Sequence, residues 1–244
     1  MIKFNDFRYI DTHCHLDLYK DYKSVIEDSK ANETLVLAVT STPSVFKQDS
    51  ALFDDNNNII TSLGLHPQIA EQYAQQINLF EELLPNTQFI GEVGIDDPKN
   101  TKQIEIFKRI LKAAATYGDK IISVHSRNSA NEVVPIIGSA YPGHIIMHWY
   151  SGSFKLLRES INNGYLFSIN PAMVISKTGQ QIISSLPLDC ILTETDGPFT
   201  KIGERNTVPA NVQIVIEYLA KVHNKTTEEI RNIIKTNFFS TYQK

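Results

Sequence analysis

The feature that most constrains this chain is an alternation of short, β-branched apolar runs with longer amphipathic stretches, repeated along its whole length. Parallel strands covered by crossover helices produce such a pattern, because each strand is buried on both faces while each helix buries one stripe. The strand candidates are Tyr9–His13, Leu35–Thr40, Ile59–Leu65, Phe89–Val93, Ile121–Val124, Ile145–His148, Tyr165–Ile169 and Cys190–Thr193. This order predicts an α/β fold, the (β/α)8 TIM barrel.

The stretches between these runs have helical periodicity. We expect helices at about Tyr22–Ala31, Pro43–Phe53, Ala74–Leu84, Thr101–Tyr117, Ala130–Gly138, Phe154–Asn162, Gly179–Ser185, Ala210–Val222 and Thr227–Thr241. The pattern is clearest where Ile106, Phe107, Ile110 and Leu111 fall on one stripe. A length of 244 residues is close to that of one barrel, so residues 1–244 are expected to form a single domain.

Composition and charge exclude several classes of protein. The net charge of −4 argues against binding of nucleic acid through a broad positive field, so any phosphate contacts must be local. No run approaches the roughly 20 apolar residues of a membrane span, and residues 1–6 lack the apolar core of a signal peptide. Two cysteines are too few for a disulfide scaffold. We therefore expect a cytoplasmic protein with reduced thiols and no membrane contact.

The segment Asp11-Thr12-His13-Cys14-His15 closes the first strand candidate. Because side chains alternate across a strand, Asp11, His13 and His15 are expected on one face, with Thr12 and Cys14 on the other. Two imidazoles on one face can chelate a cation. Cys14 is expected to be a buried apolar thiol and neither a ligand nor a nucleophile.

Further residues of metal-binding types lie at the ends of later strand candidates, where a barrel carries its active site: His66, Glu92, His125, His148 and Asp196. Of the 7 histidines, all but His144 and His223 stand at such positions, and these two are expected to have structural or solvent-exposed roles. A buried cluster of ionisable groups is costly unless a metal or a reaction compensates it. The pattern therefore predicts a metal-dependent active site.

Six motifs in order along the chain carry a family resemblance. They are Asp11-Thr12-His13-Cys14-His15-Leu16-Asp17, Gly64-Leu65-His66-Pro67, Gly91-Glu92-Val93-Gly94-Ile95-Asp96, His125-Ser126-Arg127, His148-Trp149-Tyr150-Ser151-Gly152-Ser153 and Glu194-Thr195-Asp196-Gly197-Pro198-Phe199. With them the chain resembles the TatD family of metal-dependent deoxyribonucleases, within the amidohydrolase superfamily of metallo-dependent hydrolases. More narrowly, His15-Leu16-Asp17-Leu18-Tyr19 with His148-Trp149 and the last motif is similar to the TatD-like component of the Qat anti-phage systems.

The resemblance implies two divalent metal ions, Zn²⁺, Mn²⁺ or Mg²⁺. It implies that His13, His15 and Asp196 hold one, and that Glu92 bridges to a second held by His125 and His148. Two cations about 3.5–4 Å apart can bind one phosphate between them. Asp196 is then the natural acceptor for the proton of the attacking water. Mixed imidazole and carboxylate ligands suit Zn²⁺ or Mn²⁺ better than the oxygen shell of Mg²⁺.

Other residues are expected to act on the substrate or on the ligands. His66 has no evident metal partner in this scheme and is assigned to a phosphate oxygen or the leaving group. Arg127 and Arg205 are candidates for binding flanking phosphates, which a guanidinium matches. A second shell that orients imidazoles is predicted from Glu194, Asp96 and Asp11.

The chain departs from the family pattern at two positions. Gln68 stands where many relatives have a second histidine after His-Pro, and Asp97 stands where they have an aromatic residue. The segment from Asp96 to Thr101 also looks short beside the usual loop. Every implied metal ligand is retained, so these departures bear on the shape of the substrate and on the preferred nucleic acid.

The favoured function is a phosphodiesterase, a 3′–5′ exonuclease on DNA ends, acting with partner proteins in anti-phage defence. One alternative is an amidohydrolase or deacylase on a small or nucleic-acid-linked substrate, since the fold alone does not separate these reactions. Another is a non-catalytic subunit that binds nucleic acid or partners in a defence complex. Retention of both Glu92 and Asp196 counts against that role. The physiological metal, DNA against RNA, exonuclease against endonuclease and the oligomeric state stay open.

Overall fold

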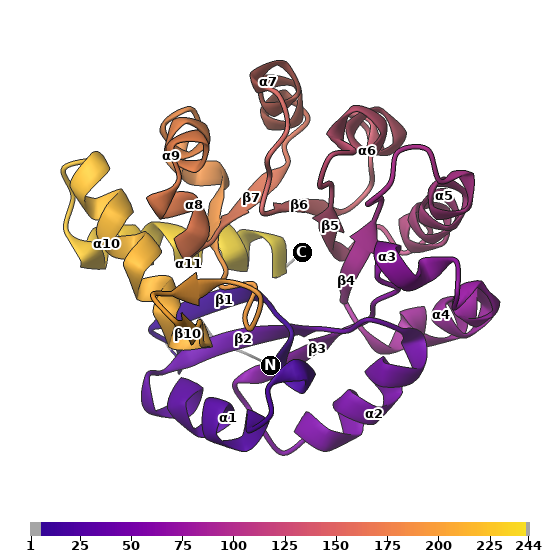
Figure 1. Cartoon of the computed structure of the whole chain (residues 1–244), viewed down its shortest axis with the longest axis horizontal. Helices are drawn as coiled ribbons and strands as arrows, with labels where there is room; N and C mark the ends of the chain where they lie inside the picture. Colours follow the sequence, from indigo (N-terminus) through magenta and orange to yellow (C-terminus); the bar gives the residue numbers. More distant parts are fainter. Residues whose placement is uncertain (1–5, 243–244) are drawn as a thin grey trace. The chain divides into compact units, whose positions relative to one another are not determined.

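The structure is a computed structural model that describes residues 6–242, and strands alternate with helices along it (Figure 1). The strands are β1 (Tyr9–Cys14), β2 (Thr34–Val39), β3 (Ile59–Ser62), β4 (Phe89–Gly94), β5 (Ile121–His125), β6 (His144–His148), β7 (Leu166–Ile169), β8 (Ile191–Thr193), β9 (Lys201–Ile202) and β10 (Arg205–Asn206). The order β1 to β8 with intervening helices confirms the predicted (β/α)8 class. Among the described residues, no helix is both long enough and apolar enough to span a bilayer.

Most helices lie between successive strands in the sequence, and the last two follow β10. The helices are α1 (Tyr22–Ala31), α2 (Pro43–Phe53), α3 (Pro67–Ala70), α4 (Ile77–Leu83), α5 (Thr101–Ala115), α6 (Ala130–Ile137), α7 (Phe154–Asn162), α8 (Pro171–Ile175), α9 (Lys177–Ser184), α10 (Val212–Val222) and α11 (Thr227–Tyr242). Short 3-10 turns are η2 (Leu16–Leu18), η3 (Ala74–Gln76), η4 (Leu84–Asn86), η5 (Leu188–Cys190) and η6 (Pro209–Asn211).

The chain divides into two compact units, each built from stretches that are distant in sequence. Of the described residues, the first unit takes in 6–38, 54–60 and 168–242, and the second takes in 39–53 and 61–167. Each unit contains buried apolar side chains and carries part of the predicted site. The single domain expected for residues 1–244 stays a prediction.

In the first unit, β1 lies between β2 and β8. It pairs with β2 as a parallel strand, with Asp11 opposite Val36. On its other side, the Thr12 hydroxyl donates to the carbonyl of Thr193 (3.0 Å), and the Thr193 hydroxyl donates to the carbonyl of Ile10 (2.5 Å). All six residues of β1 are buried. The strand that carries His13 is therefore held on both sides.

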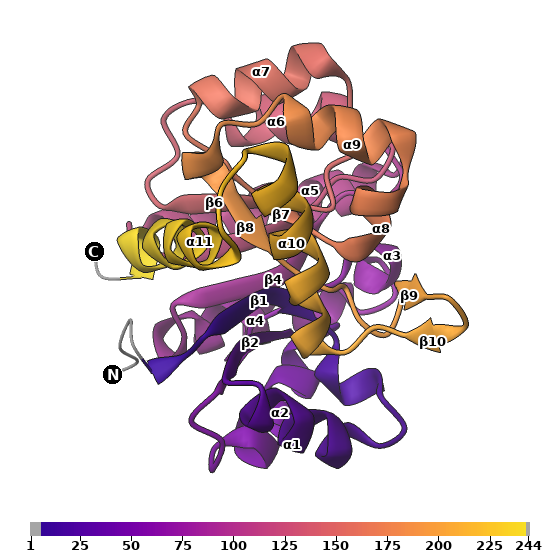
Figure 2. The same cartoon turned by 90° about the vertical axis from the view of Figure 1, so that its left-hand side faces the viewer.

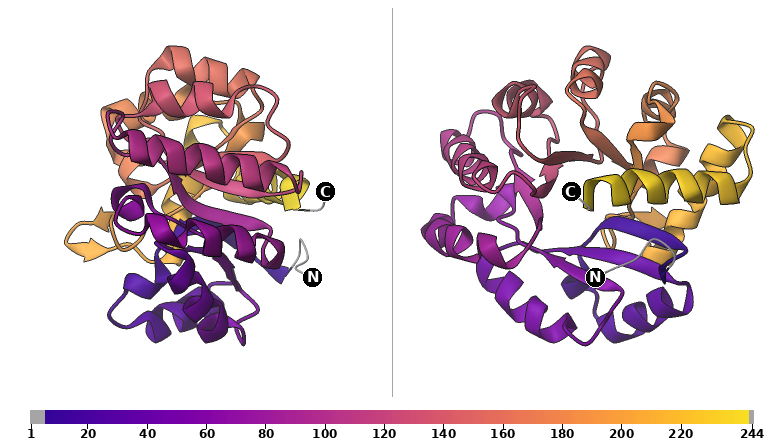
Figure 3. Two further views of the ribbon diagram at one scale, coloured as in Figure 1. Left: turned by 90° about the vertical axis from the view of Figure 1, so that its right-hand side faces the viewer. Right: turned by 180° about the vertical axis from the view of Figure 1, so that it is seen from behind.

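The last helix closes the core of the first unit. A capping box starts α11: the Thr226 amide donates to Glu229 Oε2 (2.7 Å), and the Glu229 amide donates to Thr226 Oγ1 (3.1 Å). Further along, the Asn237 side-chain amide donates to the carbonyls of Leu188 and Ile191, both at 2.8 Å. These bonds fasten α11, yellow in the right-hand view of Figure 3, to the start of β8.

The second unit is organised around the parallel strands β4, β5 and β6, which are neighbours in that order. Asn100 caps α5 by accepting from the amides of Lys102 and Gln103. The predicted apolar stripe of this helix is buried, and its polar side carries Arg109, which donates to both carboxylate oxygens of Glu81 on α4 (2.7 and 2.6 Å). In the left-hand view of Figure 3, α5 runs across the front of the picture.

A glycine brings the His66 segment close to its neighbours within the second unit. Leu63 donates to the carbonyl of Phe89 (3.0 Å) and accepts from the amide of Gly91 (2.9 Å). A Cβ at the next residue, Gly64, would lie 1.7 Å from the carbonyl oxygen of Thr40. Only glycine permits this approach of two backbones. The chain then continues to His66 at the end of the segment.

The structure adds elements that the sequence pattern did not predict. The helices α3 and α8 and the hairpin β9–β10 are too short to show a periodicity. The helix expected over Ala74–Leu84 is wrong in part, because the chain begins as a 3-10 turn and becomes α-helical only at Ile77. In addition, β1 ends at Cys14, which places His15 outside the strand.

Candidate metal centre

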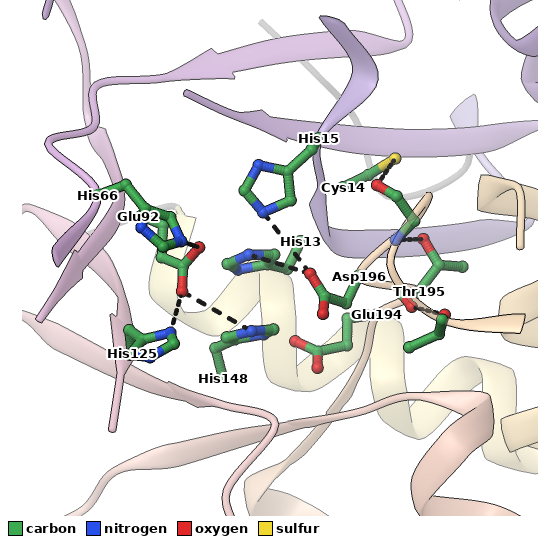
Figure 4. A network of polar contacts seen from close by, with 12 residues as sticks. His13, Cys14, His15, His66, Glu92, His125, His148, Glu194, Thr195 and Asp196 are labelled. Atoms are coloured by element: carbon green, nitrogen blue, oxygen red, sulfur yellow. Dashed lines mark hydrogen bonds and ion pairs between the residues drawn. The ribbon is translucent and has the colours of Figure 1, made fainter. Parts of the chain in front are cut away.

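The first unit brings together His13, His15 and Asp196 (Figure 4). The Nε2 atoms of His13 and His15 lie 3.8 and 3.6 Å from Asp196 Oδ1. Each of the three residues offers one ligand atom, and these atoms lie within 4.8 Å of one another. All three residues are buried, so the carboxylate is removed from bulk water and requires nearby positive charge. The geometry suits a single cation held by two imidazoles and one carboxylate.

The two histidines converge without sharing a strand. The expected alternation across β1 is wrong at its last step, because His15 has φ −87° and ψ 74° and precedes η2. Its ring still meets that of His13 edge to face, with centroids 5.3 Å apart. Cys14 is fully buried, with its sulfur 3.6 Å from the carbonyl oxygen of Gly197. Burial raises the pKa of this thiol, which keeps it protonated, as expected of a buried apolar thiol.

The backbone at Asp196 has an uncommon conformation that its neighbours maintain. Its φ is +52°, in the left-handed region, which costs most non-glycine residues roughly 1–2 kcal/mol. Its amide donates to the carbonyl of His13 (2.8 Å). Its own carbonyl accepts from the amides of Phe199 (2.8 Å) and Thr200 (3.3 Å). The carboxylate is therefore positioned before any ligand binds.

Asp11 joins the end of β1 to the loop after β8. Its carboxylate accepts hydrogen bonds from the amide of His13 (3.1 Å) and from the amide and hydroxyl of Thr195 (2.9 and 2.5 Å). Complete burial raises the pKa of Asp11, although these hydrogen bonds act in the opposite direction. We expected Asp11 to orient an imidazole, whereas these contacts position the backbone on either side of the cluster.

We expect Thr195→Val to destabilise the protein. The variant keeps the shape of the side chain but removes the hydroxyl that donates to buried Asp11, and an unsatisfied buried acceptor costs about 1–3 kcal/mol. Urea unfolding should show that loss, whereas Thr195→Ser should retain most of the stability.

Thr116→Val is the matched control, because the Thr116 hydroxyl is exposed and bonds only within the last turn of α5. This change should alter the free energy of unfolding by less than about 0.5 kcal/mol. An unfolding midpoint for Thr195→Val equal to that of the unmodified protein would show that the Asp11–Thr195 contact does not stabilise the loop.

The second unit forms a cluster around the carboxylate of Glu92 (Figure 4). One oxygen, Oε2, lies 3.0 Å from His66 Nε2. The other, Oε1, lies 2.5 Å from His125 Nδ1 and 3.9 Å from His148 Nε2. The Glu92 side chain comes from β4 and is almost fully buried. A single carboxylate thus faces three imidazoles, and His66, Glu92 and His125 offer ligand atoms within 4.8 Å of one another.

His66 lies within this cluster, whereas the sequence indicated no metal partner for it. Its Nδ1 accepts from the amide of Gln68 (3.2 Å), so a neutral ring carries its proton on Nε2 and donates it to Glu92. Its position at the end of the third strand candidate and its place in the Gly64-Leu65-His66-Pro67 motif were the sequence signals for this placement.

Asp96 contacts His125 on the side opposite Glu92. Its Oδ1 lies 2.8 Å from His125 Nε2 and accepts from the side-chain amide of Gln68 (3.2 Å). The Asp96 amide in turn donates to Gln103 Oε1 (2.9 Å). Burial lowers the pKa of His125, but Glu92 and Asp96 outweigh it and leave that pKa raised. Sequence reasoning missed the positioning role of Gln68 and Gln103.

The remaining predicted residues fall into two groups. Glu194 is fully buried; its carboxylate accepts from the Ser168 hydroxyl and from the Asn170 side-chain amide (3.0 Å). Arg127, two residues after His125, and Arg205, on β10, are both exposed. The arginines are therefore accessible to a ligand, while Glu194 is anchored within the first unit.

The donor chemistry of both clusters fits divalent metal ions. Each combines imidazole nitrogens, all buried except that of the partly exposed His66, with a buried carboxylate, the mixture that Zn²⁺ and Mn²⁺ accept. A cation would also compensate the buried negative charge of Asp196 in the first unit and of Glu92 in the second. On donor type and burial, both clusters can hold a metal.

Comparison with known proteins identifies the family. Residues 10–243 match the sequence family described as TatD related DNase. The chain belongs to the TatD family. It is therefore a metal-dependent hydrolase with the (β/α)8 fold of its family.

Relatives of this TatD protein match over almost their whole length. An uncharacterized metal-dependent hydrolase of Methanocaldococcus jannaschii is 32% identical over 243 residues, covering 95% of this chain and 96% of the relative. The human protein named deoxyribonuclease TATDN3 is 27% identical, covering 96% and 94%. The crystal structure of the Escherichia coli TatD homologue YjjV superposes with a TM-score of 0.87 at 23% identity, covering 96% and 97%, which supports the fold.

Proposed function

We propose that this TatD protein is a 3′–5′ exonuclease that releases nucleotides from DNA ends. The observation that carries the proposal is the pair of buried imidazole–carboxylate clusters, one around Asp196 and one around Glu92. Both sets of residues come from the carboxyl ends of strands, where (β/α)8 enzymes carry their active sites. Deoxyribonuclease names among its relatives favour a phosphodiester substrate over an amide.

In this proposal two metal ions serve one reaction. His13, His15 and Asp196 would hold one ion, His125 and His148 would hold the other, and Glu92 would be the ligand that both ions share. Bound divalent ions supply Lewis acidity, which neutralises charge on the phosphate and makes water more acidic. The support is the donor chemistry of each cluster and the strand-end position of each ligand.

The protein side chains then have separate tasks. Asp196 accepts the proton of the attacking water, and its fixed backbone holds the carboxylate for that step. His66, whose side chain is partly exposed, would turn its Nε2–H from Glu92 to a phosphate oxygen or the leaving group when a substrate binds. The exposed Arg127 and Arg205 bind flanking phosphates. Asp11, Asp96 and Glu194 act by positioning the metal ligands and the backbone around them.

We place this activity in anti-phage defence, in the cytoplasm and together with partner proteins. The support is the combination His15-Leu16-Asp17-Leu18-Tyr19 with His148-Trp149, which resembles the TatD-like component of Qat systems. Co-purification with the products of neighbouring genes would test this assignment, and a protein that elutes alone and protects no host from phage would contradict it.

A direct assay tests the activity. We expect the metal-replete protein to shorten 5′-labelled single-stranded DNA stepwise from its 3′ end, in Mn²⁺, Zn²⁺ or Mg²⁺, and to lose that activity in excess chelator. Circular single-stranded DNA controls for endonuclease activity, RNA tests the choice of sugar, and p-nitrophenyl esters test the deacylase alternative. Cleavage of the esters without cleavage of any nucleic acid would overturn the proposal in favour of acyl chemistry.

A further inference from the structure

Phe199 is an exposed aromatic side chain beside the first cluster. It lies three residues after Asp196, and its side chain is 58% exposed. Its ring meets that of His15 edge to face, with centroids 5.0 Å apart. A single exposed phenylalanine is ordinary on a protein surface. Phe199, however, contacts His15, a candidate metal ligand. A substrate that binds at this cluster can therefore also contact the Phe199 ring.

The segment that carries Phe199 is anchored at both ends. The Phe199 amide donates to the carbonyl of Asp196 (2.8 Å). The hydroxyls of Thr200 and Thr207 lie 2.6 Å apart, the Thr207 amide donates to the carbonyl of Thr200 (3.0 Å), and the hydroxyl of Tyr19 donates to the carbonyl of Thr207. A ring on so constrained a backbone loses little conformational entropy when a ligand stacks on it.

The hairpin that follows adds positive charge and further apolar surface. Every residue of β9 and β10 is exposed, and the turn between them uses Gly203 with φ +61°. Figure 2 shows the hairpin extending away from α10. Lys201 and Arg205 are its cations, and Ile202 is 40% exposed. Next to β9, Ile175 of α8 is 75% exposed.

We propose that Phe199 is the stacking platform for an unpaired terminal base, and that Lys201 and Arg205 bind the phosphates that follow. Proteins bind single-stranded nucleic acid with this combination of aromatic faces and cations. A base is joined to its phosphate through one sugar, so a phosphate at the His15 cluster brings its base within reach of the ring packed against His15. The inference rests on the proposed nuclease function and deepens it: the substrate end is single-stranded.

Removing the Phe199 ring should weaken substrate binding only where the substrate has a terminal base. For an oligonucleotide with a natural 3′-terminal base, Phe199→Ala should reduce kcat/KM between about 5-fold and 150-fold, mainly through KM. Phe199→Trp should restore it, and Phe199→Leu should not. For the same oligonucleotide with an abasic terminal residue, the penalty of Phe199→Ala should shrink to within about 2-fold, because there is no base to stack.

Lys221→Ala and Val222→Ala are matched controls from the same unit. Both side chains are exposed in the last turn of α10, about 15 Å along the helix from its first residue. Both variants should leave kcat/KM unchanged on either oligonucleotide. Metal content is measured for every variant, and Phe199→Ala should keep the content of the unmodified protein.

Three outcomes would overturn the inference. Equal penalties on natural and abasic ends would mean that the ring only supports His15, while the nuclease function would stand. A change in sedimentation of Phe199→Ala, with unchanged kinetics, would mean that a second copy of the chain covers the ring. Failure of the unmodified protein to bind or cleave any nucleic acid would remove the proposed function and the inference with it.

Discussion

Asp196→Asn is expected to slow hydrolysis by about 10²–10⁴-fold, the contribution of a positioned general base. The amide keeps an oxygen in nearly the same place, so metal binding and the backbone hydrogen bonds to His13, Phe199 and Thr200 should persist. What the variant loses is the carboxylate that accepts the proton of the attacking water. Single-turnover cleavage of labelled DNA, with metal content determined on the same samples, measures the effect.

Asp189→Asn is the matched control, because Asp189 is an exposed aspartate in η5 of the same unit. Its rate should equal that of the unmodified protein. If Asp196→Asn retained its metal and cleaved at the unmodified rate, Asp196 would be a ligand alone, and the base would have to be sought among other groups. A variant that lost its metal would place the whole effect in ligation, which the metal determination reveals.

Glu92→Ala is expected to abolish hydrolysis and to lower metal content at both positions. Its two carboxylate oxygens face His66 on one side and His125 with His148 on the other, and in the proposed site Glu92 is the ligand that both ions would share. Removing a residue that only hydrogen-bonds to a metal ligand commonly lowers metal affinity by roughly 10–100-fold. Loss of a carboxylate that itself binds the metal should lower the affinity further. Elemental analysis after dialysis against buffered metal provides the measurement.

Glu105→Ala serves as the control, since Glu105 is an exposed glutamate of α5 in a surface ion pair with Lys102. Such pairs contribute little to stability, so this variant should keep its metal and its rate. Two full equivalents of metal in Glu92→Ala would show that Glu92 does not bridge. One full equivalent would mean that it serves a single ion, and the two-ion reaction would need another shared ligand.

Local sequence patterns determined the order of strands and helices and the set of candidate ligands. A strand that is buried on both faces and a helix that is buried along one stripe each give a characteristic pattern of apolar residues in the local sequence. This local pattern is why α1, α2 and α7 have the predicted bounds. Metal-binding residue types at strand ends indicated the chemistry. Family motifs then narrowed the reaction to hydrolysis.

Tertiary structure alone decided which of these side chains meet. His15 leaves the strand, Asp196 adopts a positive φ, and His66 packs against Glu92. None of these follows from a local period, because each depends on a partner far away in sequence, such as the carbonyl of His13 for Asp196. The same holds for the Asp11–Thr195 hydrogen bonds, which link residues 184 positions apart. Long-range contacts of this kind choose among conformations that the local sequence leaves nearly equal in free energy.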